Sequence, residues 1–314
     1  MRRKVIIDCD PGIDDAFALV AAFSATDIEI LGVTTTAGNK GLDAVTKNAL
    51  RLKKLMNVPV KIYAGKESQI SDTLDAAMFH GGDGMGNSNL PYEINELQEE
   101  TASDFLIEMA KQYPHEIDLI TIGPLTNVAQ ALKKDTAAMK NLKSIYMMGG
   151  GLHRGNVTQY AEFNFYFDAE ATAAVINDLA DFVEIQIMTL DASHQTLFTA
   201  KDSAFIKDNG GKTGEILAHI FQPYADAYHQ ANGYNGAVIH DLLLVLYYLN
   251  PNIVSKISEE NLMIITEGEK KGQTVLDPKG KKVKLILDMN DVDWKNDFIS
   301  IVFPEKYSAY LLAF

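Results

Sequence analysis

Short β-rich runs alternate with helical patterns along most of this chain, and this alternation limits its possible folds more than any other feature. The runs that predict strands are 4–8, 28–36, 60–64, 117–122, 144–148 and 182–188. Helical sequence follows these runs, and at 42–56 the apolar residues recur at helical spacing. Such alternation is typical of parallel sheets whose two faces are both covered by helices. We therefore predict an α/β fold with a mostly parallel open sheet and helices on both faces.

The character of the sequence changes between Glu267 and Phe303. Here "QTVLDPKGKKVKLILDM" predicts two strands joined at "DPKG", residues 277–280. We expect these strands to form a C-terminal β-hairpin appended to the sheet. No linker rich in proline, serine or glycine divides the chain, so we expect one domain over residues 1–314.

Charge and cysteine content exclude several classes of function. The chain has 42 acidic and 28 basic residues, a formal net charge of −14, and no long basic tract, which argues against nucleic-acid partners. Cys9 is the only cysteine, so an intrachain disulfide and a cysteine-based zinc site are excluded. We see neither a secretory signal nor a run long enough to span a bilayer, and we expect a cytoplasmic protein without a membrane partner.

Polar clusters follow four of the predicted strands. They read "DCDPGIDD" from Asp8, "TAGN" up to Asn39, "GPLTN" from Gly123, and "GGGLHRGN" up to Asn156. Open parallel sheets bind ligands outside the carboxyl ends of their strands. The pattern therefore places these clusters at one edge of the sheet, where we expect the functional site.

The first cluster holds four carboxylates, Asp8, Asp10, Asp14 and Asp15, within eight residues. One explanation is a capped helix, with Asp10 as the N-cap and Pro11 at the first helical position. A cap accounts for one or two of the four aspartates. Carboxylates that converge without a cation must be partly protonated, whereas a hard cation such as Ca²⁺ or Mg²⁺ removes that conflict. The cluster therefore favours a metal site over a purely structural role.

Seven segments, found in order between Asp8 and Asp241, carry a resemblance to a known family. They are "DCDPGIDDA", "TTTAGNK", "HGGDGMGN", "IGPLTNVA", "MGGG", "GNVTQYAEFNFYFDAEA" and "IHD". Together they resemble the motifs of the inosine-uridine preferring nucleoside hydrolases, enzymes that cleave the N-glycosidic bond of ribonucleosides with water. The resemblance implies a Rossmann-like fold, a ribonucleoside substrate, a role in nucleoside salvage, and a homo-oligomer, either a tetramer or a dimer.

The resemblance also implies a metal and two catalytic residues. A Ca²⁺ ion would be held by Asp10, Asp15, Asp241 and the backbone carbonyl of Ile122. Asp10 would act as the general base on a metal-bound water. His240 would assist departure of the base, which leaves more readily when protonated. The alternative for His240 is that it only orients its neighbour Asp241.

Further residues are implied as substrate ligands. Asp14 and Asn164 would bind the ribose diol, Asn156 and Glu162 the 5′-hydroxyl, and Met148 the sugar face; the remaining candidates are Asn39, His80 and Tyr228. Several have structural alternatives. Asn39 after Gly38 also reads as a turn, His80 as a solvated loop residue, and Tyr228 with Tyr224 as core packing. In 162–165, polar and aromatic residues alternate, which predicts that Glu162 and Asn164 share a face.

For the nucleobase, we expect either a preference for pyrimidines or no preference. Two other functions share features with this sequence. The "DxD" after the first strand is also found in haloacid dehalogenase-type phosphatases, but "GDGMGN" lies too early for their second acidic motif. A non-catalytic nucleoside- or Ca²⁺-binding protein would be expected to lack Asp10 or His240, and both are present.

Overall fold

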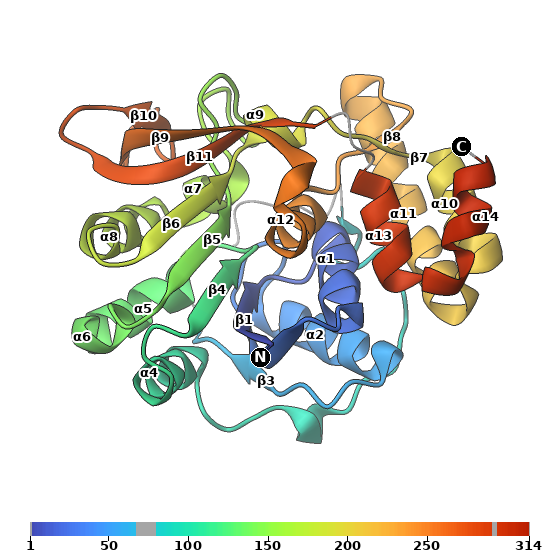
Figure 1. Ribbon diagram of the computed structural model, residues 1–314, viewed down its shortest axis with the longest axis horizontal. Helices are drawn as coiled ribbons and strands as arrows, with labels where there is room; N and C mark the ends of the chain where they lie inside the picture. Colours follow the sequence, from blue (N-terminus) through green and yellow to red (C-terminus); the bar gives the residue numbers. More distant parts are fainter. Residues whose placement is uncertain (1, 67–79, 291–293, 314) are drawn as a thin grey trace.

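A nine-stranded, mostly parallel sheet forms the centre of the molecule (Figure 1). The computed structural model describes residues 2–66, 80–290 and 294–313. The strand order is β10-β9-β11-β6-β5-β4-β1-β2-β3. The seven parallel strands are β1 (Arg3–Cys9), β2 (Ile28–Thr35), β3 (Ile62–Ala64), β4 (Ile117–Thr121), β5 (Ser144–Met148), β6 (Glu184–Met188) and β11 (Lys281–Met289). The predicted α/β class with a mostly parallel sheet is therefore confirmed.

Two antiparallel strands extend the sheet beyond β11, at the edge where a hairpin was predicted. β9 (Val254–Ile264) pairs with β11 on one side and with β10 (Thr274–Leu276) on the other. The strands on either side of "DPKG" both exist as predicted, and the Gly280 N–H donates to the Asp277 carbonyl to close the turn. The pairing differs from the prediction, because β9 lies between them and forms the hairpin with β10.

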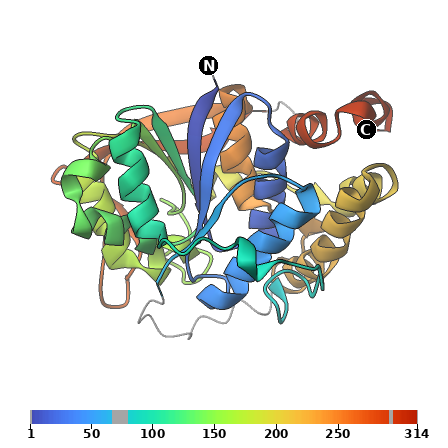
Figure 2. The ribbon, with the colours of Figure 1, turned by 90° about the horizontal axis from the view of Figure 1, so that it is seen from below.

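Helices cover both faces of the sheet (Figures 1 and 2), and each face has its own apolar core. Alternation along β1 sends Val5 and Ile7 into one core and Ile6 into the other. The first core includes α1 (Ile13–Ser24), α2 (Leu42–Met56), α12 (His240–Leu249) and α13 (Trp294–Val302). The second includes α4 (Ala102–Gln112), α5 (Thr126–Lys134), α6 (Thr136–Met139) and α8 (Ala169–Leu179).

The remaining elements lie around this framework. α10 (Ala200–Asn209), α11 (Gly211–Asn232) and α14 (Tyr307–Ala313) lie beside α13, and β7 (Phe198–Thr199) pairs with β8 (Gly236–Ala237). Two short helices, α7 (Phe163–Phe167) and α9 (Leu190–Ser193), follow β5 and β6. The 3₁₀ turns are Ile94–Glu96, Pro251–Ile253 and Pro304–Lys306. In the part of the chain that the structure describes, no helix combines the length and apolarity needed to cross a bilayer.

The topology fixes where a ligand can bind. Strands β3-β2-β1-β4-β5-β6 follow the order 3-2-1-4-5-6, so the chain turns in opposite directions from β1 and from β4. A crevice opens at such a reversal, outside the carboxyl ends of the two strands. The segments after Cys9 and Thr121 border this crevice, and these are the segments that carry "DPGIDD" and "IGPLTN".

Candidate active site

The turn between β1 and α1 places three of the aspartates. β1 ends at Cys9, Gly12 is the N-cap of α1, and the helix begins at Ile13. The Asp15 carboxylate accepts the backbone N–H of Gly12 at 2.9 Å and that of Asp10 at 3.2 Å. The first turn is thus capped from within by Asp15, and the prediction of Asp10 as the N-cap is wrong. Asp10 lies two residues before the N-cap, and its carboxylate accepts the Asn39 N–H instead.

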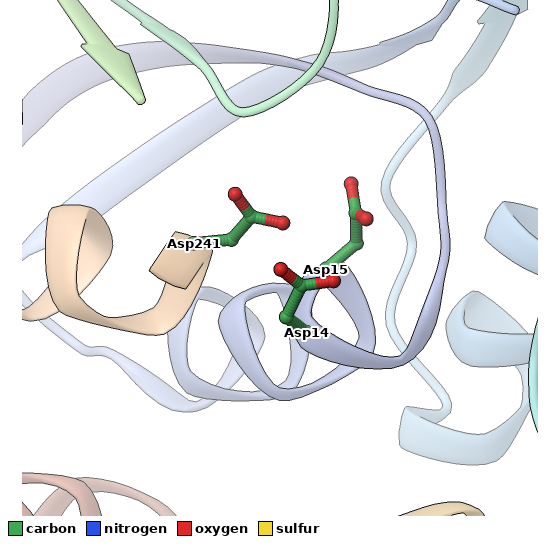
Figure 3. Close-up of side chains that lie close together, drawn as sticks. All are labelled: Asp14, Asp15 and Asp241. Atoms are coloured by element: carbon green, nitrogen blue, oxygen red, sulfur yellow. The ribbon is translucent and has the colours of Figure 1, made fainter. Parts of the chain in front are cut away.

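Three buried carboxylates converge at the helix N-termini of α1 and α12. Asp14 and Asp15 come from the first turn of α1, and Asp241 from the first turn of α12 (Figure 3). One oxygen from each lies within 4.8 Å of the others. Asp10 is outside this group, although the charge of Asp15 raises the pKa of Asp10 and the charge of Asp10 raises that of Asp241. The structure therefore brings together Asp15 and Asp241 from the predicted ligand set, together with Asp14, which was predicted to bind ribose.

Burial without a cation makes this cluster electrostatically costly. It raises the pKa of Asp14 to about 8 and that of Asp15 to about 6, and the neighbouring carboxylate of Asp15 adds to the shift at Asp14. Burial also raises the pKa values of Asp10 and Asp241 well above the ordinary value, followed by repulsion from Asp15 and Asp14 respectively. Among the described residues, no lysine or arginine forms an ion pair with these four carboxylates. A divalent cation would supply the missing positive charge.

The donors of the cluster fit such a cation. Asp10 Oδ2 accepts the Asn39 N–H at 2.6 Å, while Oδ1 is buried and, among the described residues, has no hydrogen-bond partner. Asp14 Oδ1 is in the same state. Buried polar atoms are normally paired, so unpaired oxygens on carboxylates that repel one another indicate a place for a hard, oxygen-preferring ion.

Two glycines hold Asp10 in place by close packing. A Cβ atom on Gly38 would lie 2.1 Å from Asp10 Oδ2, and one on Gly123 would lie 2.6 Å from Oδ1. Neither distance is possible between real atoms. The absence of side chains at these two positions therefore allows the loops after β2 and β4 to close over the Asp10 carboxylate.

Ile122 directly follows the last residue of β4. Its N–H donates to the Asp8 carbonyl at 2.8 Å, which continues the β1–β4 pairing. Its own carbonyl accepts the Asn164 Nδ2 amide at 3.1 Å, and that amide also donates to the Met148 carbonyl at 3.0 Å. The Asn164 side chain thus joins the carboxyl ends of β4 and β5 and sets the direction of the Ile122 carbonyl.

A cavity of about 540 Å³ opens above this cluster. Asp10 and Asp15 are buried and do not line the cavity, but all other predicted site residues do. These are Asp14, Asn39, His80, Ile122, Met148, Asn156, Glu162, Asn164, Tyr228, His240 and Asp241. This size matches small-molecule sites. The structure thus brings distant parts of the sequence together around one cavity.

Asn39 and His80 both contact the turn that carries the aspartates. Asn39 Nδ2 donates to the Asp10 carbonyl at 3.1 Å and to Asp15 Oδ2 at 3.0 Å, so Asn39 is more than a turn residue. His80 Nδ1 accepts the Ile13 N–H at 3.1 Å, and burial lowers the His80 pKa to about 3. His80 is therefore a buried, neutral histidine with its proton on Nε2, and the solvated-loop alternative is wrong.

Glu162 and Asn156 organise the loop after β5. Glu162 is the N-cap of α7 and accepts the N–H groups of Gly150, Asn164 and Phe165 at 2.8–3.0 Å. Burial raises its pKa to about 7. Asn156 Oδ1 accepts the Phe163 N–H at 2.9 Å. Residues 163–167 form a helix and not an alternating strand, yet Glu162 and Asn164 both line the cavity, in agreement with the predicted shared face.

The opposite part of the cavity wall includes Tyr224 and Tyr228 from α11, His240 from α12, and His194 directly after α9. His240 Nε2 lies 3.0 Å from the Tyr228 hydroxyl, and Nδ1 lies 2.8 Å from Ser193 Oγ. Burial lowers the His240 pKa well below its ordinary value, and the nearby His194 and His80 add to this effect. His240 is therefore neutral at pH 7.

Sequence reasoning missed several residues around this wall. The overlooked lining residues are His153, Arg154, Gly155, Val157, Phe163, His194 and Tyr234. Ser193 and His194 belong to "TLDASHQT", a polar cluster that follows β6. The rule that selected the clusters after the other strands would have selected this one as well.

Comparison with known proteins gives a consistent picture. The family model described as "Inosine-uridine preferring nucleoside hydrolase" matches residues 5–297. The chain is 33% identical over 285 residues to probable uridine nucleosidase 1 of Oryza sativa subsp. japonica, covering 90% of this chain and 87% of that protein. It is 34% identical to the inosine-uridine preferring nucleoside hydrolase of Leishmania major, covering 81% of each chain. A solved structure, the purine-preferring ribonucleoside hydrolase from Gardnerella vaginalis, matches with a TM-score of 0.89 and 29% identity, covering 96% of this chain and 98% of that one.

Proposed function

Because the chain belongs to the inosine-uridine preferring nucleoside hydrolase family and is an enzyme that hydrolyses ribonucleosides, we propose that it does so with Ca²⁺, with Asp10 as general base, and with His240 assisting base departure. Membership of this metal-dependent hydrolase family contradicts both alternatives, the haloacid dehalogenase-type phosphatase and the non-catalytic binding protein. The products are ribose and the free base.

The convergence of Asp14, Asp15 and Asp241 at the cavity is the single observation that carries this proposal. Asp10, Asp15, Asp241 and the Ile122 carbonyl would hold the ion, and Ca²⁺ suits a set of several oxygens without strict geometry. When bound, Ca²⁺ would fix the ribose hydroxyls and lower the pKa of a water. Asp14 belongs to the same cluster, lines the cavity and would bind the ribose diol.

Asp10 would take the proton of the attacking water. Its Oδ1 atom is buried and without a described partner, so it can accept that proton, while the Asn39 N–H holds Oδ2. The water attacks the anomeric carbon from the side opposite the base. The carbon–nitrogen bond breaks, its electrons stay with the base, and the anomeric configuration is inverted.

The loop after β5 would recognise the rest of the ribose. Glu162 and Asn156 would bind the 5′-hydroxyl, and the Asn164 carbonyl oxygen would accept from the diol, because its Nδ2 is committed to two backbone carbonyls. Met148 lines the cavity beside them and would pack against the sugar. Asn39 supports the aspartates, and His80 offers an N–H donor to the substrate.

His240 would assist the leaving base through its contact with Tyr228. Both ring nitrogens already have partners, and Tyr228 lies on the cavity wall, so the effect of His240 reaches the base by way of the Tyr228 hydroxyl or after that hydroxyl moves. We propose turnover of pyrimidine ribonucleosides or of both base classes. The rice relative is named for uridine and the Leishmania relative for inosine and uridine, which supports uridine as a first substrate.

Removal of the metal tests the proposal. Protein treated with EDTA should lose hydrolysis of uridine and inosine, and added Ca²⁺ should restore it. Full activity in a preparation shown by elemental analysis to be metal-free would contradict the proposed metal. Deoxyuridine should be a poorer substrate than uridine by ~10²-fold or more, because the 2′-hydroxyl partners would remain unpaired. Equal turnover of the two would refute the proposed ribose contacts.

We also propose that the chain works as a cytoplasmic homo-oligomer, a tetramer or a dimer, built from a single-domain subunit that serves nucleoside salvage. Light scattering coupled to size-exclusion chromatography tests the oligomeric state. One cooperative unfolding transition in calorimetry would agree with a single domain, and two separated transitions would contradict it.

A further inference from the structure

The Ser193 hydroxyl is a buried polar group that the proposed chemistry does not use directly. Ser193 is fully buried at the end of α9, and its Oγ lies 2.8 Å from His240 Nδ1. Among the described residues, this ring nitrogen is its one side-chain hydrogen-bond partner. Because no other side-chain or backbone acceptor is found for this hydroxyl among the described residues, its buried proton has a partner only if Ser193 donates to Nδ1.

This direction determines where His240 carries its own proton. If Nδ1 accepts from Ser193, it carries no proton, so the ring proton must be on Nε2. Nε2 lies 3.0 Å from the Tyr228 oxygen and therefore donates to it. In the opposite tautomer Nε2 would be an acceptor. The Tyr228 hydroxyl would then donate its proton to His240 and could not donate it to the substrate.

We propose that Ser193 is a positioning residue, which fixes the His240 imidazole with its proton on Nε2 and so directs a chain of hydrogen-bond donors toward the leaving base. Ser193 donates to His240, and His240 donates to Tyr228. A hydroxyl whose oxygen accepts a hydrogen bond becomes a stronger donor through its own proton. Tyr228 would thus stabilise the electrons that the base retains when the glycosidic bond breaks. The inference rests on the proposed role of His240.

The surroundings of α9 hold Ser193 in a fixed place. Thr189 Oγ1 donates to the Ile286 carbonyl of β11 at 2.7 Å, and the Leu190 N–H donates to the Gly150 carbonyl at 2.9 Å. The Ser193 N–H donates to the Thr189 carbonyl at 3.0 Å. The His194 ring packs edge-on against the His240 ring, with centroids 5.1 Å apart. The chain between β6 and α9 is thus tied to β11 and to the loop after β5, which fixes the backbone position of Ser193 beside His240.

Ser193→Ala is the first test. It should lower kcat for uridine and inosine by about 10-fold with little change in KM, because the ribose contacts and the metal ligands are untouched. Turnover of p-nitrophenyl riboside, whose leaving group needs no assistance, should stay within twofold of wild type. Ser193→Cys keeps the volume with a weaker donor and should fall between wild type and Ser193→Ala. Should the alanine variant not fold, the cysteine variant alone decides, since an unchanged kcat in it would contradict the proposal.

A matched control separates positioning from a general loss of packing. Ser144 is also buried and begins β5, at the end of the strand away from the cavity. Its hydroxyl donates to the carboxylate of Asp118 in β4. Ser144→Ala should lower the melting temperature without changing kcat for either substrate. If Ser193→Ala and Ser144→Ala behave alike, Ser193 is only structural.

A double-mutant cycle with His240→Ala completes the test. If Ser193 acts through His240, Ser193→Ala should cost no further activity in the His240→Ala background. Equal losses from Ser193→Ala in both backgrounds would overturn the inference. Failure of the proposed function looks different: wild type would not cleave nucleosides, or His240→Ala would not distinguish uridine from p-nitrophenyl riboside. An active, substrate-selective wild type with an unaffected Ser193→Ala variant would refute the role of Ser193 alone.

Discussion

At the scale of single residues, His240 combines burial, neutrality and two hydrogen-bonded ring nitrogens. His240→Ala should lower turnover of inosine and uridine by ~10²–10⁴-fold, the usual range for a group that assists proton transfer. Turnover of p-nitrophenyl riboside should fall far less, because its leaving group departs without assistance. Steady-state kinetics on both substrates, together with a calcium titration, make the measurement. Parallel losses with weaker Ca²⁺ binding would instead mean that His240 orients Asp241.

Gly38 gives a second prediction at this scale. Gly38→Ala places a methyl group 2.1 Å from Asp10 Oδ2, so the general base must move, and kcat should fall by ~10²-fold. The matched control is Gly41→Ala in the same loop, where nothing lies within 4 Å of the added Cβ, and which should keep wild-type kcat. Comparable activity in the two variants would show that the exact place of Asp10 is unimportant.

At the scale of elements, most helices and strands of the sheet could be predicted from the sequence, because the spacing of apolar residues reflects which side chains are buried. α2 and β5 have the predicted bounds, and the other parallel strands of the first two-thirds of the chain differ at their ends by up to two residues. Pairing was harder: the strands flanking "DPKG" were found, but β9 carries no cue to its place between them. The same limit applies to 162–165, where an alternating pattern was overridden by the cap that Glu162 provides to α7.

The site was predictable to a similar degree. Residues in strand-end clusters and in the resembling motifs were placed in the cavity, because the topology brings strand ends together. The roles of partners were not predictable, since hydrogen bonds such as those of Ser193 or Asn164 depend on positions that no local pattern encodes. Asp14 illustrates the difference: its membership of the site was predicted, but its place within the carboxylate group was not.

Glu162 links an element to the substrate and gives a prediction at this scale. Glu162→Ala removes the N-cap of α7 and should destabilise the protein by about 1 kcal/mol, measured by urea denaturation. It should also raise KM for uridine by about 10-fold, because the 5′-hydroxyl loses its partner. 5′-Deoxyuridine serves as the control substrate and should show little change. An equal rise in KM for both substrates would assign Glu162 to the helix alone.

At the scale of the whole molecule, the buried acids make stability depend on pH. In the metal-free protein, burial raises the pKa of Asp14 to about 8 and the pKa values of Asp8 and Glu162 to about 7, above ordinary values near 4. At pH values between the ordinary and the raised pKa, the folded state binds more protons than the unfolded state. The free energy of unfolding of the protein therefore falls as pH rises through this range. The melting temperature with EDTA should be at least ~4 °C lower at pH 8 than at pH 5.5.

Calcium provides the control for this prediction. It should raise the melting temperature more at pH 8 than at pH 5.5, because its ligands must be ionised to bind it. Asp14→Asn should flatten the dependence in EDTA by removing one raised carboxyl group. A melting temperature that is constant or rises with pH in EDTA would show that the buried acids are not the source of the effect.

The wide separation of the carboxylates along the chain has a consequence for biosynthesis. Asp14 and Asp15 emerge from the ribosome near the start of translation, but Asp241 emerges only after six of the seven parallel strands. A nascent chain therefore cannot assemble the full carboxylate group until most of it has been made. A cation held by both Asp15 and Asp241 would bind poorly to a prematurely terminated chain, so metal binding would mark a subunit whose synthesis has passed α12.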